Sequence, residues 1–366
     1  MTQGGHCSGW DVTSGTILDP KRDILFVPDV VLGASKAMRR RDFIGALCSV
    51  AAGWPSSTSA QKASTTKRVA WFGVGRPDTP SAYVDALRAG LREKGWIDGG
   101  NLNIAIYAAR RNDMDAVAHD LVASSPDIIV TQELMVFPVQ RLRPAIPIVF
   151  GFSGDPVSGK LVDSLAHPGG DLTGMSYMAI ELVGKRIELL KEWLPQIQRV
   201  AILARPQHPG EQREHQASED ACTKLGLRLS YFPMPFLPLD DLPRLEGVLN
   251  SIPGSQSEAL VVFPDAAMFE ASQHIAQFAL QNKLPSVTGW APFARNGLLL
   301  SYGPDLREIY HSLASYVDRI LRGAKPGDLP VELPTKIEMV INAGTAKSLG
   351  LAVPSTLAAR ADEMIE

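Results

Sequence analysis

Apolar residues follow two alternating patterns from residue 68 onward. Short continuous apolar runs, as at 69–74, are typical of strands buried in a parallel sheet. Between them, apolar residues recur every three or four positions, as expected of one helical face. This first set predicts strands at 69–74, 101–107, 127–130 and 147–150 and helices at 81–95 and 113–123. Strands that alternate with helices indicate a doubly wound parallel sheet.

The same rhythm begins again after a turn-rich segment at 166–171. Residues 172–176 resemble a strand that crosses between two halves of the protein. The second set predicts strands at 200–203, 228–232, 259–263 and 285–287 and helices at 181–193, 211–225, 239–249 and 269–282. Two sets of this kind predict two lobes, each with its own core.

The third section, residues 298–366, is too small for a further domain. It predicts strands at 298–301 and 336–341, a long helix at 305–322 and a short helix at 346–349. We expect it to return to both lobes and complete the hinge. The predicted fold class is α/β, with two doubly wound parallel-sheet lobes joined by a hinge. Lobe 1 covers 61–175, lobe 2 covers 176–297, and the return segment covers 298–366.

The first 60 residues are typical of a targeting segment. Residues 1–37 lack periodicity and are expected to be an upstream, disordered extension, so that Met38 is the expected start. Residues 38–60 predict a signal peptide with an arginine cluster at 39–41, an apolar run at 43–54 and small residues up to Ala60. The apolar run is far shorter than the roughly 20 residues needed to span a bilayer. We therefore expect export to the periplasm, by the twin-arginine or the general route, without stable membrane insertion.

Composition narrows the class of protein. The chain has 366 residues, 45% of them hydrophobic and 20% charged, with a net charge of -3. This charge argues against a nucleic-acid-binding protein, which would carry a strongly basic face. Cys7 and Cys48 precede the mature domain, which leaves Cys222 as a single, structural thiol. We expect a monomer.

The candidate site residues follow the predicted strands, because open α/β sheets bind ligands beyond the carboxyl ends of their strands. A small-molecule site needs an apolar cleft with a few well-placed polar groups. The predicted ligand-binding residues are Gly75, Arg76, Asp78, Thr131, Gln132, Glu133, Asp155, Ser176, Tyr177, Arg205, His208, Asp265, Trp290 and Tyr302.

Several of these residues also have a purely structural interpretation. Asp78 is placed to cap the following helix. Asp155 precedes a proline and is placed to shape a turn. Trp290 suits a core position, and His208 lies in a polar loop where exposure to solvent is expected. The sequence leaves these alternatives open.

Signals for an enzyme are weak. The glycines at 73 and 75 follow a strand, but the third glycine of a dinucleotide-binding fingerprint is missing. Residues 151–154 are one residue short of a nucleophile elbow. The histidines show no metal-ligand spacing. We therefore expect no catalytic residues, no cofactor and no metal.

Several motifs together resemble a proteobacterial family of ABC transporter substrate-binding proteins. These motifs lie at residues 39–44, 146–150, 154–157, 167–174, 185–190, 301–303, 329–331, 334–336 and 361–363. The resemblance covers about residues 38–366 and implies the periplasmic-binding-protein type I fold, with a ligand between the lobes. Some relatives are associated with tryptophan or other aromatic amino acids. The chain departs from the family pattern in the loops at 131–135 and 204–208, so the resemblance leaves the ligand open.

The leading hypothesis is an exported receptor that traps a small organic molecule, such as an amino acid or an aromatic compound, and presents it to an ABC permease. Ligand contacts made by both lobes would favour the closed state. A ligand-sensing module that signals to a membrane sensor is the alternative. A third hypothesis is an exported hydrolase or isomerase on the same scaffold.

Overall fold

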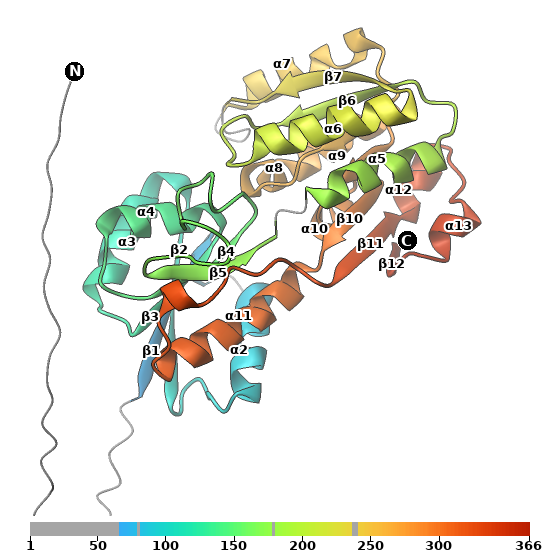
Figure 1. Cartoon of the computed structure of the whole chain (residues 1–366). Helices are drawn as coiled ribbons and strands as arrows, with labels where there is room; N and C mark the ends of the chain where they lie inside the picture. The colour runs from blue at the N-terminus through green and yellow to red at the C-terminus, as the bar shows by residue number, and fades with distance from the viewer. Residues whose placement is uncertain (1–65, 79–80, 178–179, 236–240) are drawn as a thin grey trace, which may run out of the picture. The chain divides into compact units, whose positions relative to one another are not determined.

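The computed structural model describes residues 66–78, 81–177, 180–235 and 241–366. The predicted extension and signal peptide, with Cys7 and Cys48, lie outside the described residues. Ala63–Glu366 belong to one compact unit. Two sheets covered by helices form this unit (Figure 1).

The first sheet is parallel, with the strand order β2-β1-β3-β4-β5. Its strands are β1 (Lys67–Val74), β2 (Leu102–Ala109), β3 (Ile128–Gln132), β4 (Ile148–Phe152) and β5 (Leu172–Ser176). Its helices are α2 (Ala82–Glu93), α3 (Met114–Ala123), α4 (Val136–Leu142) and α11 (Leu306–Leu321), with short 3-10 turns η1 (Arg111–Asp113), η2 (Glu133–Met135) and η5 (Pro326–Asp328). The strands and helices predicted for this region are confirmed to within a few residues.

Successive residues of β1 pack on opposite faces of this sheet. Val69 and Trp71 join the core beneath α2 and α11. Ala70 and Phe72 join the core beneath α3 and α4. Both faces are therefore buried, which explains why β1 appears in the sequence as a continuous apolar run.

The second sheet has the order β12-β11-β10-β9-β8-β6-β7. Its strands are β6 (Arg199–Ala204), β7 (Arg228–Pro233), β8 (Ala259–Val262), β9 (Ser286–Thr288), β10 (Leu300–Pro304), β11 (Ile337–Asn342) and β12 (Glu363–Ile365). Its helices are α5 (Glu181–Trp193), α6 (Glu211–Leu225), α7 (Leu242–Ser251), α8 (Ala266–Glu270), α9 (Ser272–Gln281), α10 (Ala291–Arg295), α12 (Ala343–Ser348) and α13 (Ser355–Ala358), with the 3-10 turn η4 (Pro253–Ser255). Cys222 is a buried free thiol in α6, as expected.

Strands β6 to β10 repeat the arrangement of β1 to β5. In each set the first strand pairs in parallel with the second and the third, and the fourth and fifth continue outward from the third. The sequence pattern did not indicate that β11 runs antiparallel to β10. Nor did it indicate that residues 266–281 form two helices, α8 and α9, which join at Ala271.

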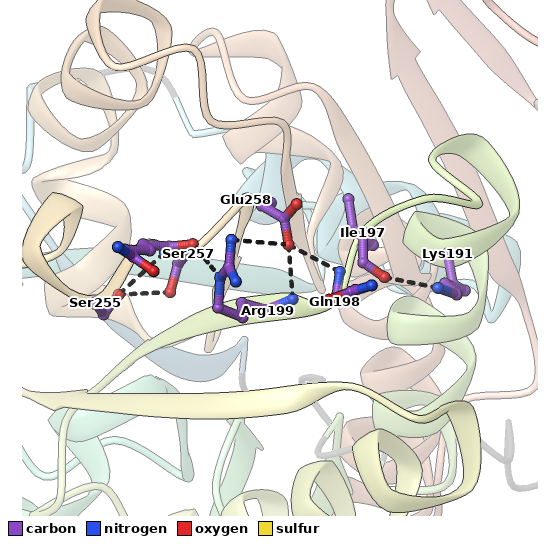
Figure 2. A network of polar contacts seen from close by, with 8 residues as sticks. Lys191, Ile197, Gln198, Arg199, Ser255, Ser257 and Glu258 are labelled. Carbon is purple, nitrogen blue, oxygen red and sulfur yellow. Dashed lines mark hydrogen bonds and ion pairs between the residues drawn. The ribbon is translucent and has the colours of Figure 1, made fainter.

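A carboxylate holds the amino end of the first and third strands together in each sheet. In the first sheet, Asp127 accepts a hydrogen bond of 2.8 Å from the backbone N–H of Arg68. In the second, Glu258 accepts bonds of 2.8 and 3.0 Å from the N–H groups of Gln198 and Arg199 (Figure 2). These networks stabilise the amino edges, on the opposite side of each sheet from the carboxyl ends where ligands bind.

The return segment contributes to both sheets. Helix α11 packs beside α2 against the first sheet, although their colours come from opposite parts of the bar (Figure 1). Trp96 donates a 2.8 Å hydrogen bond to Asp318 across this contact. Strands β10, β11 and β12 belong to the second sheet. The chain therefore crosses between the sheets after β5, before α11 and again after α11.

The last crossing runs alongside β5. Ser176 donates its backbone N–H to the carbonyl of Glu332, and Glu332 donates to the carbonyl of Gly174. Gly174 has a positive φ of 152°, and a Cβ built there would collide with the carbonyl oxygen of Phe150. This position in the crossing strand therefore requires glycine.

The two lobes also touch where the loop after β4 meets the loop after β6. Ser153 Oγ lies 2.8 Å from Nε2 of His208. The backbone N–H of Asp155 donates to the carbonyl of Pro209 at 3.1 Å, and Arg213 donates to the Asp155 carboxylate at 2.7 Å. We call Ser153, Asp155, His208, Pro209 and Arg213 the lobe contact.

Replacing Gly174 by alanine is expected to lower the free energy of unfolding by about 2 kcal/mol or more, because the methyl group meets the backbone of β4. Chemical denaturation measures this change. The control is Gly247→Ala, at an exposed position of α7 with open space around it. There alanine should stabilise the helix by up to about 1 kcal/mol. A Gly174→Ala protein within roughly 0.5 kcal/mol of the parent would contradict the close approach.

The Asp155 carboxylate should stabilise the fold in a pH-dependent way. Burial raises its pKa, but hydrogen bonds from Arg213, Ser158 and Val157 outweigh burial and hold the pKa below its ordinary value of 3.8. A lowered pKa gives stability that is complete above the ordinary pKa and is lost as pH falls through the lowered one.

We therefore expect Asp155→Asn to lower the free energy of unfolding at neutral pH, because the ion pair with Arg213 is lost. The loss should be only about 1 kcal/mol, since Arg213 is largely exposed and solvent screens the pair. The difference should shrink as pH falls below 3.8, the ordinary pKa of an aspartate, and through the lowered pKa of Asp155. Urea denaturation across this pH range measures it. Asp115→Asn, which removes an exposed ion pair with Arg141, serves as the control and should change stability by less than about 0.5 kcal/mol. A loss of stability in Asp155→Asn that does not change with pH would argue against an electrostatic role of the carboxylate.

Candidate functional site

A cavity of about 920 Å³ lies between the carboxyl edge of the first sheet and elements of the second lobe. From the first lobe it is lined by the ends of β1, β2 and β3 and by the first turns of α2 and α11. From the second lobe it is lined by α8, α10 and one residue of β11, Glu338. The volume suits a small organic ligand.

Aromatic side chains from both lobes form one wall of this cavity. The ring of Tyr310 lies 4.8 Å from that of Tyr83 and 5.3 Å from that of Trp71. The ring of Tyr177 lies 5.8 Å from that of Trp290 and 6.5 Å from that of Tyr310. These five residues, which we call the aromatic wall, connect the first sheet to the second lobe. Rings at these separations offer faces and edges against which a flat ligand can stack.

The Glu133 carboxylate lies beside this wall. Glu133 begins η2 directly after β3 and has a positive φ of 54°, an uncommon conformation for a non-glycine residue. Its side chain is 3% exposed. One carboxylate oxygen, Oε2, accepts hydrogen bonds from the N–H of Ser153 at 3.3 Å and from its hydroxyl at 2.5 Å. The other oxygen, Oε1, accepts a hydrogen bond from the hydroxyl of Tyr177.

The electrostatic state of Glu133 follows from its burial. Loss of solvent raises its pKa to about 7, although the hydrogen bonds from Ser153 and Tyr177 oppose this rise. Burial, with the nearby Glu133 charge, also raises the pKa of Tyr177 and Tyr310 well above the usual range. Both phenols therefore stay neutral, and Glu133 is partly ionised near neutral pH.

Charged side chains at the rim of the cavity are mostly paired. Arg76 bonds Asp78 at 3.2 Å, and Arg295 bonds Glu363. Arg110 and Arg307 line the cavity at exposed positions. Neither has a hydrogen-bonded or ion-paired side-chain partner within the described ranges. The exposed guanidinium groups of Arg110 and Arg307 therefore lie at the mouth of the cavity, and the buried carboxylate of Glu133 lies in its interior.

Half of the residues predicted from sequence line the cavity. They are Gly75, Arg76, Asp78, Gln132, Glu133, Tyr177 and Trp290. The helix-capping interpretation of Asp78 is wrong, because Ser81 supplies the N-cap of α2. Trp290 is both a core residue and a lining residue: its ring packs on Phe293 and forms part of the aromatic wall.

The other seven predicted residues lie outside the cavity, and five of them use their side-chain polar groups in contacts within the protein. The seven are Thr131, Asp155, Ser176, Arg205, His208, Asp265 and Tyr302. The main cause is that loops distant in sequence pair with one another. Arg205 donates to Asp265 at 3.1 Å, and Asp265 caps α8 through the N–H of Met268. The charged ends that the sequence offered to a ligand thus neutralise each other.

The remaining displaced residues have equally local roles. His208 is buried by its contact with Ser153, so the expectation that it would be exposed is wrong. Asp155 caps the turn at 156–158 and belongs to the lobe contact. The Ser176 hydroxyl donates to the carbonyl of Gly154 at 3.0 Å.

The last two displaced residues, Thr131 and Tyr302, lie within strands of the two sheets. Thr131 is fully buried in β3. Tyr302 packs partly buried against the second core, and its carbonyl accepts a 2.8 Å bond from Arg186.

Residues on helices were missed by the strand-end rule. Tyr83 in the first turn of α2 and Tyr310 in α11 are two of the five residues of the aromatic wall, and Trp71 of β1 is a third that was missed. Tyr310 occupies an apolar position of the predicted long helix, where its pattern resembles that of a core residue. The available signal for Tyr83 was its place just after the first strand–helix loop.

Metal-ligating side chains do not converge in the described part of the chain: no three histidine, cysteine, aspartate or glutamate residues there could hold an ion. Within the same ranges, the helices are either too short or too polar to cross a bilayer. The cavity is therefore interpreted from its aromatic, carboxylate and arginine groups.

Comparison with known proteins supports this interpretation of the fold. Residues 77–365 match the family described as ABC transporter substrate binding protein. A tyrosine-binding protein of Clostridioides difficile strain R20291 is 24% identical over 283 residues, which cover 76% of this chain and 79% of the relative.

Solved structures agree with the same architecture. A conserved domain protein from Vibrio cholerae O1 biovar El Tor strain N16961 superposes with a TM-score of 0.72 at 27% identity, covering 82% of this chain and 99% of the other. An ABC domain from Streptococcus pneumonia in complex with L-Trp gives a TM-score of 0.72 at 20% identity, covering 82% and 100%. The chain belongs to the ABC transporter substrate binding protein family, and its two parallel-sheet lobes have the type I periplasmic-binding-protein fold.

Proposed function

We propose that this protein is the exported solute receptor of an ABC importer and that it traps a small molecule with an aromatic ring between its lobes. The observation that carries the proposal is the cavity at the carboxyl edge of the first sheet, with an aromatic wall drawn from both lobes. A cleft lined by aromatic side chains together with precisely placed polar groups is the usual form of a small-molecule site.

The aromatic wall favours a ligand that touches both lobes at once. Trp71 lies in β1 of the first sheet, and Tyr83 and Tyr310 lie on helices packed against it. Trp290 precedes α10 of the second lobe. A ring placed between them would gain contacts that exist only when the lobes are close. Such differential contacts shift the population toward the closed state, which is the state a permease would recognise.

The relatives point to the same ligand class. One is named as a tyrosine-binding protein, and a structural neighbour was solved with L-Trp. Aromatic amino acids and their derivatives are therefore the first solutes to test. The family supports delivery to an ABC permease in the inner membrane, and the signal peptide expected at 38–60 supports periplasmic export.

Ligand binding should raise the melting temperature, because a ligand confined to the folded state stabilises it. A thermal-shift screen would cover aromatic and other amino acids, aromatic acids and amines, and sugars. At a concentration about 100-fold above Kd, the stabilisation is about 2.7 kcal/mol. A screen in which no solute shifts the transition would contradict a receptor function.

The aromatic wall is tested by Tyr83→Leu, which removes a lining ring while keeping an apolar side chain. We expect the affinity for the ligand found in the screen to fall about 10- to 100-fold, because ring stacking and apolar contact area are lost. Isothermal titration calorimetry measures this change. Tyr107→Leu, at a partly buried tyrosine of β2 outside the cavity, is the matched control and should keep the affinity of the parent. Equal affinities for the parent, Tyr83→Leu and Tyr107→Leu would show that the aromatic wall does not contact the ligand.

The export step has its own test. The mature protein recovered from the exported fraction is expected to begin at Gln61, because cleavage after the small residue Ala60 ends the signal peptide. N-terminal sequencing or intact mass measures the cleavage point. Replacing Arg40 and Arg41 by lysine should reduce export by the twin-arginine route and leave the general route working. A mature protein that retains residues 1–37 would contradict the signal-peptide assignment.

A further inference from the structure

The Glu133 carboxylate is a buried acid without a cationic partner. Its neighbours donate from hydroxyl groups and one backbone N–H. Its side chain takes part in no ion pair with lysine, arginine or histidine in the described part of the chain. By contrast, two buried acids of the second lobe lie beside arginines: Asp265 bonds Arg205 at 3.1 Å, and Glu214 lies 3.8 Å from Arg186. A buried charge is costly unless it is paired.

The hydrogen bonds around Glu133 leave room for one more donor. A carboxylate oxygen can accept two bonds. Oε2 accepts two from Ser153, whereas Oε1 accepts one from the Tyr177 hydroxyl. Because Glu133 also lines the cavity, the free acceptor position is available to a ligand there.

The surroundings of this acceptor suit a cation. Tyr177, Tyr310, Tyr83 and Trp290 present aromatic rings around the same cavity. Aromatic faces attract ammonium groups through their quadrupoles, and rings grouped into a cage are a recurring form of ammonium site. We infer that Glu133 and the aromatic wall form a subsite for the protonated amine of the ligand, so that the substrate class is arylalkylamine cations, with or without a carboxylate.

This inference deepens the proposed function and rests on it. A ligand carboxylate is dispensable because the lining arginines either have partners or lie at the exposed rim. A ligand amine, in contrast, supplies the positive charge that the interior lacks. We therefore expect the protein to prefer ligands that carry an amine, and to bind them whether or not they also carry a carboxylate.

The charge on Glu133 makes binding depend on pH. The other ionisable groups that face it are Tyr83 on α2, Tyr177 after β5, Tyr310 on α11, Asp265 before α8 and, through Ser153, His208 after β6. Burial raises the pKa of the three phenols, Arg205 neutralises Asp265, and burial lowers the pKa of His208, so that its ring is neutral. Burial raises the pKa of Glu133 to about 7, so that its charge changes near neutral pH.

A cation binds the ionised carboxylate, so affinity should be highest above this pKa and fall as pH decreases through it. The limiting slope is about tenfold per pH unit. Near neutral pH, binding should also release a proton from Glu133. The released proton makes the calorimetric enthalpy depend on the ionisation enthalpy of the buffer.

The test compares three probes that share the indole ring: tryptamine, L-tryptophan and indole-3-propionate. Each is titrated into the wild-type mature protein, Glu133→Gln and Glu211→Gln at about pH 6 and about pH 8. Glu211 is a matched control, because it is buried and accepts a 2.6 Å bond from Tyr231 outside the cavity. Thermal unfolding of each variant confirms that it is folded.

We expect tryptamine and L-tryptophan to bind at least about 10-fold more tightly than indole-3-propionate. Glu133→Gln should weaken the two amines by about 10- to 100-fold and abolish both their pH dependence and the proton release. Glu211→Gln should behave like the parent. The preference of the wild-type protein among the probes tests the inference even if Glu133→Gln fails to fold.

Two kinds of failure are distinguishable. If indole-3-propionate binds as tightly as tryptamine, or if Glu133→Gln binds the amines like the parent, the amine subsite is overturned while a receptor for aromatic solutes stands. If none of the three probes binds but a solute without an amine binds in the thermal-shift screen, the inference is again overturned and the receptor function remains. If the solute that binds is another arylalkylamine, it replaces tryptamine in the comparison with its own acid lacking the amine. If no solute binds at all, the proposed function fails and the inference fails with it.

Discussion

Helices cover both faces of each sheet, so that the carboxyl edge shared by its parallel strands is the part left to meet a ligand. In β1, Val69 and Trp71 are buried on one side and Ala70 and Phe72 on the other. Because parallel strands end at a common edge, this constraint gathers the loops after β1, β2 and β3 at one place. The cavity lies there, and the positions of the aromatic wall and Glu133 depend on it.

The amino and carboxyl edges of the sheets carry acids with different roles. At the amino edges, Asp127 and Glu258 accept backbone hydrogen bonds and hold the first and third strands together. At the carboxyl edge of the first sheet, Glu133 is held by Ser153 and Tyr177, but its charge is not matched. Asp127 and Glu258 therefore have a structural role, whereas Glu133 can pair with a cationic ligand.

The fold was largely predictable from the chain because it depends on local periodicity. The continuous apolar runs marked β1, β4 and β8, and the helical pattern marked α5 and α11. The direction of β11 and the break between α8 and α9 were not predictable in this way, since a strand pattern is the same in either direction and the break is a local turn at Ala271.

The site was predictable only in part, and the reason is pairing over long sequence distances. Strand ends placed Gln132 and Glu133 on the cavity. No local pattern shows that Arg205 will meet Asp265 sixty positions later, or that His208 will meet Ser153. Tyr310 was missed for a related reason, because it reaches the cavity from a helix that packs on the first sheet although it lies late in the chain.

The late position of α11 has a consequence for synthesis. The first sheet is complete once residue 176 has been made, but the apolar face that α11 covers waits for residues 306–321. During synthesis the second lobe is therefore made while part of the first core is still uncovered. Such transiently exposed apolar surface favours aggregation and contact with chaperones, so the nascent chain should depend on them more than a protein whose domains follow one another in sequence.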